Sequence, residues 1–127
     1  MEDIIKRISR RYEGDIGLRP PFMGEAELDF PPELLDLLRE SNGISETMLH
    51  PKTFEPIDIA WVLYPYEQIL EGTALLLEDH GVEGWNFADD GADCLYLRKA
   101  DGSISCYDQL ERTETRAAGS LEEFYTG

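Results

Sequence analysis

The sequence is poor in positive charge and in cysteine, and it has no long apolar run. Only 11 lysines and arginines stand against 27 aspartates and glutamates, which gives a formal net charge of −16. Such a surface repels nucleic-acid phosphates and anionic lipids, so we expect neither as a partner. It would instead steer a basic partner toward the protein, or serve only to keep the protein soluble. No apolar run approaches the ~20 residues that cross a bilayer.

The length and the first residues favour one domain without a leader. A chain of 127 residues suits a single domain that buries roughly two-thirds of its unfolded surface. Residues 1–7 are charged and lead into no apolar stretch, so we expect no secretory signal. We predict one domain over residues 1–127, with an N-terminal helix and loop in residues 1–24 and a motif-bearing core in residues 25–127.

Motifs for catalysis are missing. The two histidines, His50 and His80, lie in unrelated segments, and neither has a cysteine or an aspartate at metal-ligand spacing. The sequence contains no Gly-x-Ser-x-Gly elbow and no phosphate-binding Gly-Lys-Ser/Thr. Neither cysteine has an identifiable base. We therefore predict no catalytic residue, no metal and no cofactor, and we expect that the protein is not an enzyme.

The sequence does contain a strand-rich stretch over residues 85–107, against which the rest of the chain is expected to pack. Asp101-Gly102 supplies the positive-φ residues that a hairpin turn needs. Loops of residues 101–102 or 99–102 both fit this turn, and both place the apolar residues of the two flanking strands on one face. These residues are Leu95, Leu97, Ile104 and Cys106.

The two cysteines are predicted to be reduced. In either register Cys94 lies on the face opposite Cys106, and a disulfide that spans ~4 Å between Cβ atoms cannot pass through the sheet. Reduced thiols favour a reducing compartment, so we predict a cytoplasmic protein. Tyr96 lies on the face away from Leu95 and Leu97, where it is available as an interface anchor.

Local patterns predict the remaining elements. Pro31-Pro32 opens a helix that Asn42-Gly43 ends, with the glycine as its left-handed cap. A second helix runs from Tyr66 to His80-Gly81, although Gly72 lowers its propensity by about 1 kcal/mol. Its apolar positions are Tyr66, Ile69, Leu70, Ala74 and Leu77. The other expected elements are a helix over 2–11, a loop over 14–24, loop or ragged strand over 44–59, strands over 60–64 and 111–116, and a terminal helix opened by a capping box at 120–123.

The candidate binding residues are acidic and lie at predicted turns. Asp89, Asp90 and Asp93 crowd three carboxylates together, a composition that suits a hard divalent cation, a partner-binding edge or a tight turn. The EF-hand pattern is absent, and turn formation is the simplest of the three interpretations. Asp101 and Asp108 add carboxylates at the ends of the predicted hairpin.

Two stretches of the sequence resemble the SUKH superfamily of Smi/Knr-type domains. The first, residues 25–43, has an acidic start, a proline-containing entry to a leucine-rich helix and a closing Asn42-Gly43. The second is a series of shorter matches. It comprises Trp85, residues 87–91, Asp93, residues 101–104, residues 107–108 and residues 120–124. Together the two stretches cover most of the chain.

The resemblance implies an α+β fold, with a curved mixed or antiparallel sheet packed against several helices. Bacterial members are commonly immunity proteins that bind and neutralise toxins, often nucleases or deaminases, and no catalytic residues come with the family. We therefore predict a bacterial immunity protein that binds a basic toxin through acidic residues and one tyrosine. The predicted site residues are Asp89, Asp90, Asp93, Tyr96, Asp101 and Asp108. The alternatives are a protein-binding scaffold without a toxin partner and a metal-dependent hydrolase that uses Asp89, Asp90 and Asp93.

Overall fold

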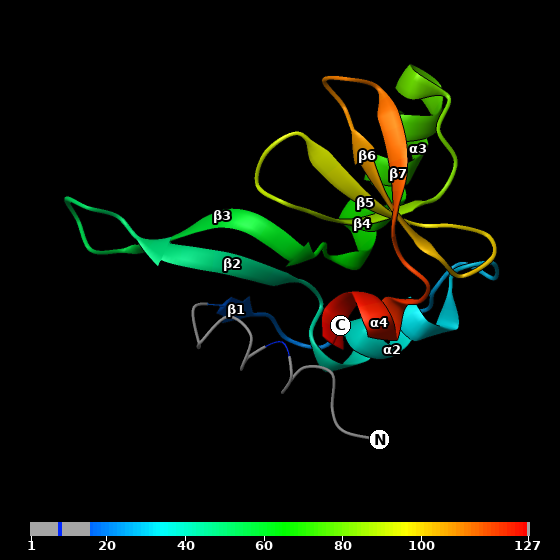
Figure 1. The fold of residues 1–127 in the computed structure, drawn as a ribbon. Helices are drawn as coiled ribbons and strands as arrows, with labels where there is room; N and C mark the ends of the chain where they lie inside the picture. The colour runs from blue at the N-terminus through cyan, green and yellow to red at the C-terminus, as the bar shows by residue number, and fades with distance from the viewer. Residues whose placement is uncertain (1–7, 9–15, 127) are drawn as a thin grey trace.

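A computed structural model describes residue 8 and residues 16–126 as an α+β domain with two antiparallel sheets, which confirms the predicted fold class (Figure 1). The helix predicted over 2–11 lies outside the described residues, apart from Ile8, which is buried. In chain order the elements are β1 (Ile16–Leu18), α2 (Pro32–Glu40), β2 (Ile44–Leu49), β3 (Pro56–Leu63), α3 (Tyr66–His80), β4 (Trp85–Asp89), β5 (Cys94–Arg98), β6 (Ile104–Asp108), β7 (Thr113–Ala118) and α4 (Leu121–Thr126).

The strands divide between a three-stranded sheet, β1-β2-β3, and a four-stranded sheet, β4-β5-β6-β7. The sheets meet where the chain leaves β3, because the Tyr64 N–H donates to the Phe87 carbonyl of β4 at 2.7 Å. The β2–β3 hairpin extends away from the rest of the molecule as an arm (Figure 1). No described helix is long and apolar enough to cross a membrane.

Two segments contain strands, one of them predicted as a loop and the other as loop or ragged strand. Residues 14–24 contain β1, and residues 44–59 contain β2 and the first half of β3. The prolines that suggested irregular structure occupy positions where a sheet tolerates them. Pro51 lies in the hairpin turn and Pro56 is the first residue of β3, so neither removes a ladder hydrogen bond from the interior of a strand.

The predicted register of the central hairpin is wrong by one residue. Arg98 pairs with Ile104, which leaves residues 99–103 as the loop, an odd number of residues instead of the even number expected. Leu97 therefore pairs with Ser105 across the two strands, and Cys106 pairs with Tyr96. A shift of one residue moves every side chain of a strand to the other face, so Cys106 joins Cys94 on one side of the sheet. The two cysteines form a disulfide with a Cα–Cα distance of 5.9 Å, and the prediction of reduced thiols is wrong.

Both long helices begin and end near their predicted residues, but two details differ. The α2 helix ends at Glu40 with an extended Ser41 as its cap, and the Asn42 side chain instead accepts the Tyr66 N–H at the start of α3, at 2.8 Å. The α3 helix ends on a left-handed Gly81, and it buries Leu76 while Leu77 is exposed. Helical spacing alone allows more than one row of α3 side chains to be the buried one. The sheet against which α3 packs determines which row is buried.

The four-stranded sheet separates two apolar clusters. The main core joins α2 and α4 to the sheet through Leu34, Leu38, Phe87, Ile104 and Tyr125. The smaller cluster joins α3 to the opposite face of the sheet through Leu76, Leu97 and Tyr107. This second contact places α3 along β4 and creates the site described below (Figure 1).

Candidate functional site

Asp89, the first of the predicted site residues, connects the two sheets. Its Oδ1 accepts the Trp61 N–H and the Gly91 N–H, each at 3.0 Å, and its Oδ2 accepts the Tyr64 hydroxyl at 2.6 Å. The carboxylate thus joins β3 and the residue that follows it to the end of β4. Asp89 has a structural role because its oxygens are engaged within the chain.

The Tyr64 hydroxyl is held in its protonated form by this arrangement. Burial raises the pKa of Tyr64 above the ordinary tyrosine value, and the hydrogen bond to Asp89 raises that pKa further. The folded protein therefore keeps a proton that the unfolded chain releases in alkaline solution.

This difference predicts a pH dependence of stability. Because the folded pKa is the higher one, the contribution of Tyr64 is complete below about pH 10 and is lost as the pH rises above it. We expect the wild-type free energy of unfolding to fall more steeply than that of Tyr64→Phe between about pH 9 and about pH 11. Urea denaturation across this range measures both slopes, and equal slopes would contradict the prediction.

Two other predicted carboxylates, Asp90 and Asp108, stabilise turns. The Oδ1 of Asp90 accepts the N–H groups of Ala92 and Cys94, and the Oδ1 of Asp108 accepts those of Leu110 and Glu111. These are the local hydrogen bonds that make aspartate common in turns.

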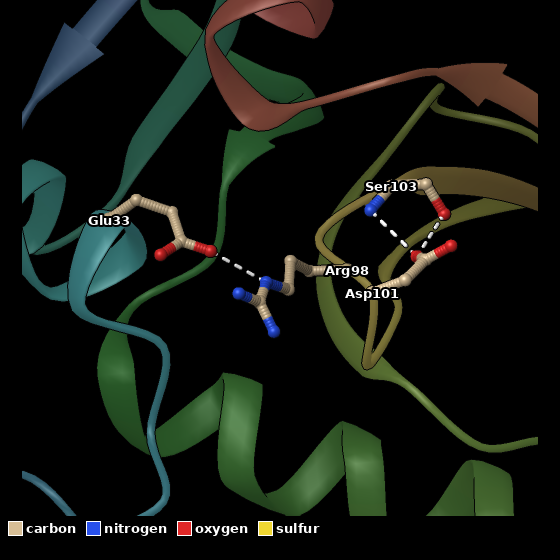
Figure 2. A network of polar contacts seen from close by, with 4 residues as sticks. All are labelled: Glu33, Arg98, Asp101 and Ser103. Carbon is tan, nitrogen blue, oxygen red and sulfur yellow. Dashed lines mark hydrogen bonds and ion pairs between the residues drawn. The ribbon is translucent and has the colours of Figure 1, made fainter.

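Asp101 has the same role in the β5–β6 loop. Its Oδ1 accepts both the backbone N–H and the hydroxyl of Ser103, at 2.9 and 2.6 Å, and these bonds lower the pKa of Asp101 (Figure 2). The nearby Arg98 of β5 donates to Glu33 of α2 at 2.6 Å, which ties the sheet to that helix (Figure 2).

The predicted site residues do not form one surface. Asp89, Asp90 and Asp93 lie at the β4–β5 turn, and Asp108 lies at the same end of the sheet because it pairs with Cys94. Asp101 lies at the opposite end of β5, in the β5–β6 loop. Among residues 8 and 16–126, no group of three or more His, Cys, Asp or Glu side chains could hold a metal ion. The metal-dependent alternative therefore has no support from the arrangement of these carboxylates.

Tyr96 is half-buried. Its ring lies against that of Phe124 in α4, with 4.7 Å between the ring centroids. It also lines a cavity of about 210 Å³ whose wall includes Trp61, Asp89 and Asp90. Tyr96, Asp89 and Asp90 thus share one hollow, although they come from different strands and a turn.

A larger cavity of about 570 Å³ lies between α3 and the four-stranded sheet. Glu67, Glu71, Leu75 and Asp79 recur every four residues along α3 and therefore lie on one face of it. They form the helix side of the cavity, and residues of β4 and β5 contribute to the sheet side. The full lining is Tyr64, Glu67, Gln68, Glu71, Gly72, Leu75, Leu76, Asp79, His80, Asn86, Leu95 and Gln109.

The charge of this cavity has one sign. Its lining contains three carboxylates and neither a lysine nor an arginine. No ion pair that the structure describes involves these three carboxylates; the described pairs are Arg98–Glu33 and Lys99–Glu114. Carboxylates gathered along a concave wall make the local electrostatic potential more negative, so the cavity favours a cation.

Sequence reasoning missed this site because its residues come from distant elements. The acids of α3 are typical of a solvated helix face, and Asn86 is an ordinary polar residue of a strand. A glycine within a predicted helix can indicate a close approach to another element, and Gly72 could have pointed to this site in that way. A Cβ at this position would lie 3.0 Å from the Asn86 Nδ2, so the glycine allows α3 to approach β4 closely.

Compared with family models, with curated proteins and with solved structures, the chain gives no match in any of the three. The resemblance to the SUKH superfamily therefore stays a prediction from the sequence.

Proposed function

We propose that the protein binds a basic protein partner, and that this partner is a bacterial toxin which it neutralises as an immunity protein. The observation that carries the proposal is the combination of a net charge of −16 with a concave surface lined by carboxylates and by no cation. Complementary charge accelerates association and rejects partners of the wrong sign. Toxins that act on nucleic acid are basic for the same electrostatic reason.

The choice of a toxin, of the nuclease or deaminase type, rests on the SUKH resemblance. The β2–β3 arm favours protein binding in general, because it exposes Met48, Leu49 and Phe54. A scaffold without a toxin partner is therefore the second candidate function.

The cytoplasm, where an immunity protein meets an incoming toxin, is part of the proposal. The Cys94–Cys106 disulfide does not favour that compartment, because disulfides are rare in cytosolic proteins. The location therefore rests on the resemblance.

The test is co-expression with the toxin domain encoded beside this gene, followed by co-purification and by calorimetry at low and at raised salt. We expect a stable complex with a basic domain, loss of the toxin's activity in the complex, and an affinity that falls as salt rises. A complex that leaves the toxin active would favour the scaffold. An affinity that does not change with salt would contradict an acidic interface.

A further inference from the structure

The smaller hollow beside Tyr96 has aromatic side chains in its wall, and we call it the aromatic cavity. Four aromatic residues line its volume of about 210 Å³: Trp61 of β3, Tyr96 of β5, and Phe124 and Tyr125 of α4. The ring centroids of Tyr96 and Phe124 are 4.7 Å apart, and those of Phe124 and Tyr125 are 5.0 Å apart. These three rings therefore adjoin one another along one part of the wall.

Carboxylates stand beside these rings, at Glu46, Asp89 and Asp90. Among the described residues, no lysine, arginine or histidine lines the cavity. The half-buried Glu46 carboxylate takes part in no hydrogen bond or ion pair within the described part of the chain. The wall thus combines ring surface with negative charge, and no described residue of the wall carries the opposite charge.

The composition of the wall decides which cation it suits. A metal ion needs several oxygen ligands around it, and no group of three or more His, Cys, Asp or Glu side chains in residues 8 and 16–126 could supply them. Aromatic rings instead attract organic cations, and quaternary ammonium groups are the ligands for which such walls are used in proteins. An alkylated ammonium needs no hydrogen-bond acceptor, so rings with nearby negative charge are sufficient to hold it.

The size of the cavity agrees with a head group. Pockets that enclose a whole drug-sized ligand have volumes of about 300–1,000 Å³, and the aromatic cavity is smaller than this range. It therefore suits the charged end of a molecule whose remainder stays outside.

The chain already makes one contact of this kind at Trp61. The Arg19 guanidinium lies over the Trp61 ring, with 5.0 Å between its central carbon and the ring centroid, and Arg19 is not among the residues that line the cavity. Because Arg19 occupies one face of Trp61, the main ring contacts of a ligand fall to Tyr96 and Phe124.

We propose that the aromatic cavity binds an alkylated ammonium group, with trimethylammonium as the type, against the rings of Tyr96 and Phe124 and beside the three carboxylates. The group can belong to a free compound such as choline or to a trimethylated lysine of another protein, since the chemistry of recognition is shared. This inference goes beyond the proposed function and does not rest on it, because it concerns a different cavity and needs no toxin.

The first experiment compares choline with two matched compounds. In 3,3-dimethylbutan-1-ol a carbon atom replaces the nitrogen, so the shape is kept and the charge is lost; ethanolamine keeps the charge and loses the methyl groups. Each is titrated into the full chain at constant ionic strength, and NMR follows the indole N–H signals of Trp61 and Trp85. We expect choline to shift the Trp61 signal, to leave that of Trp85 outside the cavity unchanged, and to bind at least about tenfold more tightly than the other two.

Three results would overturn the proposal. Equal binding of 3,3-dimethylbutan-1-ol would remove the role of charge, and equal binding of ethanolamine would remove the role of the methyl groups. Absence of any shift at Trp61 with choline and with the trimethyllysine peptide described next would remove the site.

A blocked peptide distinguishes the two sources of the group. Gly-trimethyllysine-Gly, acetylated and amidated, is titrated in the same way, with Gly-Lys-Gly as its control. We expect the trimethylated peptide to bind at least about tenfold more tightly than the control. Tighter binding of this peptide than of choline would assign the group to a modified protein, and the reverse order would assign it to a free compound.

Variants of the wall separate recognition from folding. We expect Tyr96→Leu to weaken choline binding about tenfold, whereas Tyr96→Phe keeps the ring and should weaken it less than about threefold. Glu46→Gln should weaken binding about threefold, because it removes a partly screened charge. Phe54→Leu and Glu55→Gln are the matched controls: both residues are exposed on the β2–β3 arm and lie outside the cavity, so each change should alter binding less than about twofold.

Urea denaturation reports whether each variant is folded. If Tyr96→Leu does not fold, Glu46→Gln keeps the test valid, because its carboxylate makes no described contact that folding would lose. Wild-type affinity for choline in folded Tyr96→Leu or in Glu46→Gln would overturn the assignment of the group to this cavity.

Discussion

Asp89→Ala is expected to destabilise the protein by about 3 kcal/mol. The substitution removes the acceptor of three hydrogen bonds, from the Trp61 and Gly91 N–H groups and from the Tyr64 hydroxyl. The largest part of this cost comes from the buried Tyr64 hydroxyl, because a hydrogen bond to a charged group contributes about 1.5–3 kcal/mol. Water can replace the acceptor of the exposed Gly91 N–H, so the three contributions do not add in full. Because the carboxylate joins β3 to β4, its loss loosens the contact between the two sheets.

Urea denaturation measures this effect, and Asp93→Ala is its control. Asp93 belongs to the same turn and is exposed, and its side chain accepts no hydrogen bond that the structure describes, so the change should cost less than about 0.5 kcal/mol. Similar losses from the two variants would contradict the structural role of Asp89. The comparison also matters for the site, since a loss of partner binding in an Asp89 variant would first reflect damage to the fold.

Removal of the Cys94–Cys106 disulfide is the second large change, with an expected loss of about 3 kcal/mol in the free energy of unfolding. The two cysteines are 12 residues apart, and a cross-link that closes a loop of about this length restricts the unfolded chain by an amount in this range. The cost should appear both in the double variant Cys94→Ser/Cys106→Ser and in the wild type treated with a reductant.

Mass spectrometry and denaturation together test this prediction. Without reductant, the denatured wild type should take up no alkylating reagent, and after reduction it should take up two equivalents, one for each cysteine. Reductant should leave the stability of the double variant unchanged, which separates the bond from other effects of the reagent. Alkylation of the unreduced protein would contradict the disulfide.

The sequence by itself determined the features that depend on neighbouring residues. Pro31-Pro32 predicted the start of α2, and His80-Gly81 predicted the end of α3, because a proline at a first turn and a glycine at a last turn act through local geometry. Alternation of apolar residues likewise predicted the strands within residues 85–107, whereas the α+β class was an expectation from the resemblance to the SUKH superfamily.

Only the tertiary structure decided which residues meet. The parity of one loop, residues 99–103, set the face of Cys106 and with it the disulfide, since a sheet turns a shift of one residue into a change of face. The contact between Gly72 and Asn86 brought α3 against β4 and formed the acidic cavity from segments that are separate in the chain. The acidic turn between β4 and β5 could be located from the sequence. The hydrogen bonds that Asp89 in this turn accepts from Trp61 and Tyr64 could not be predicted, because contacts between distant segments do not depend on the local spacing of residues.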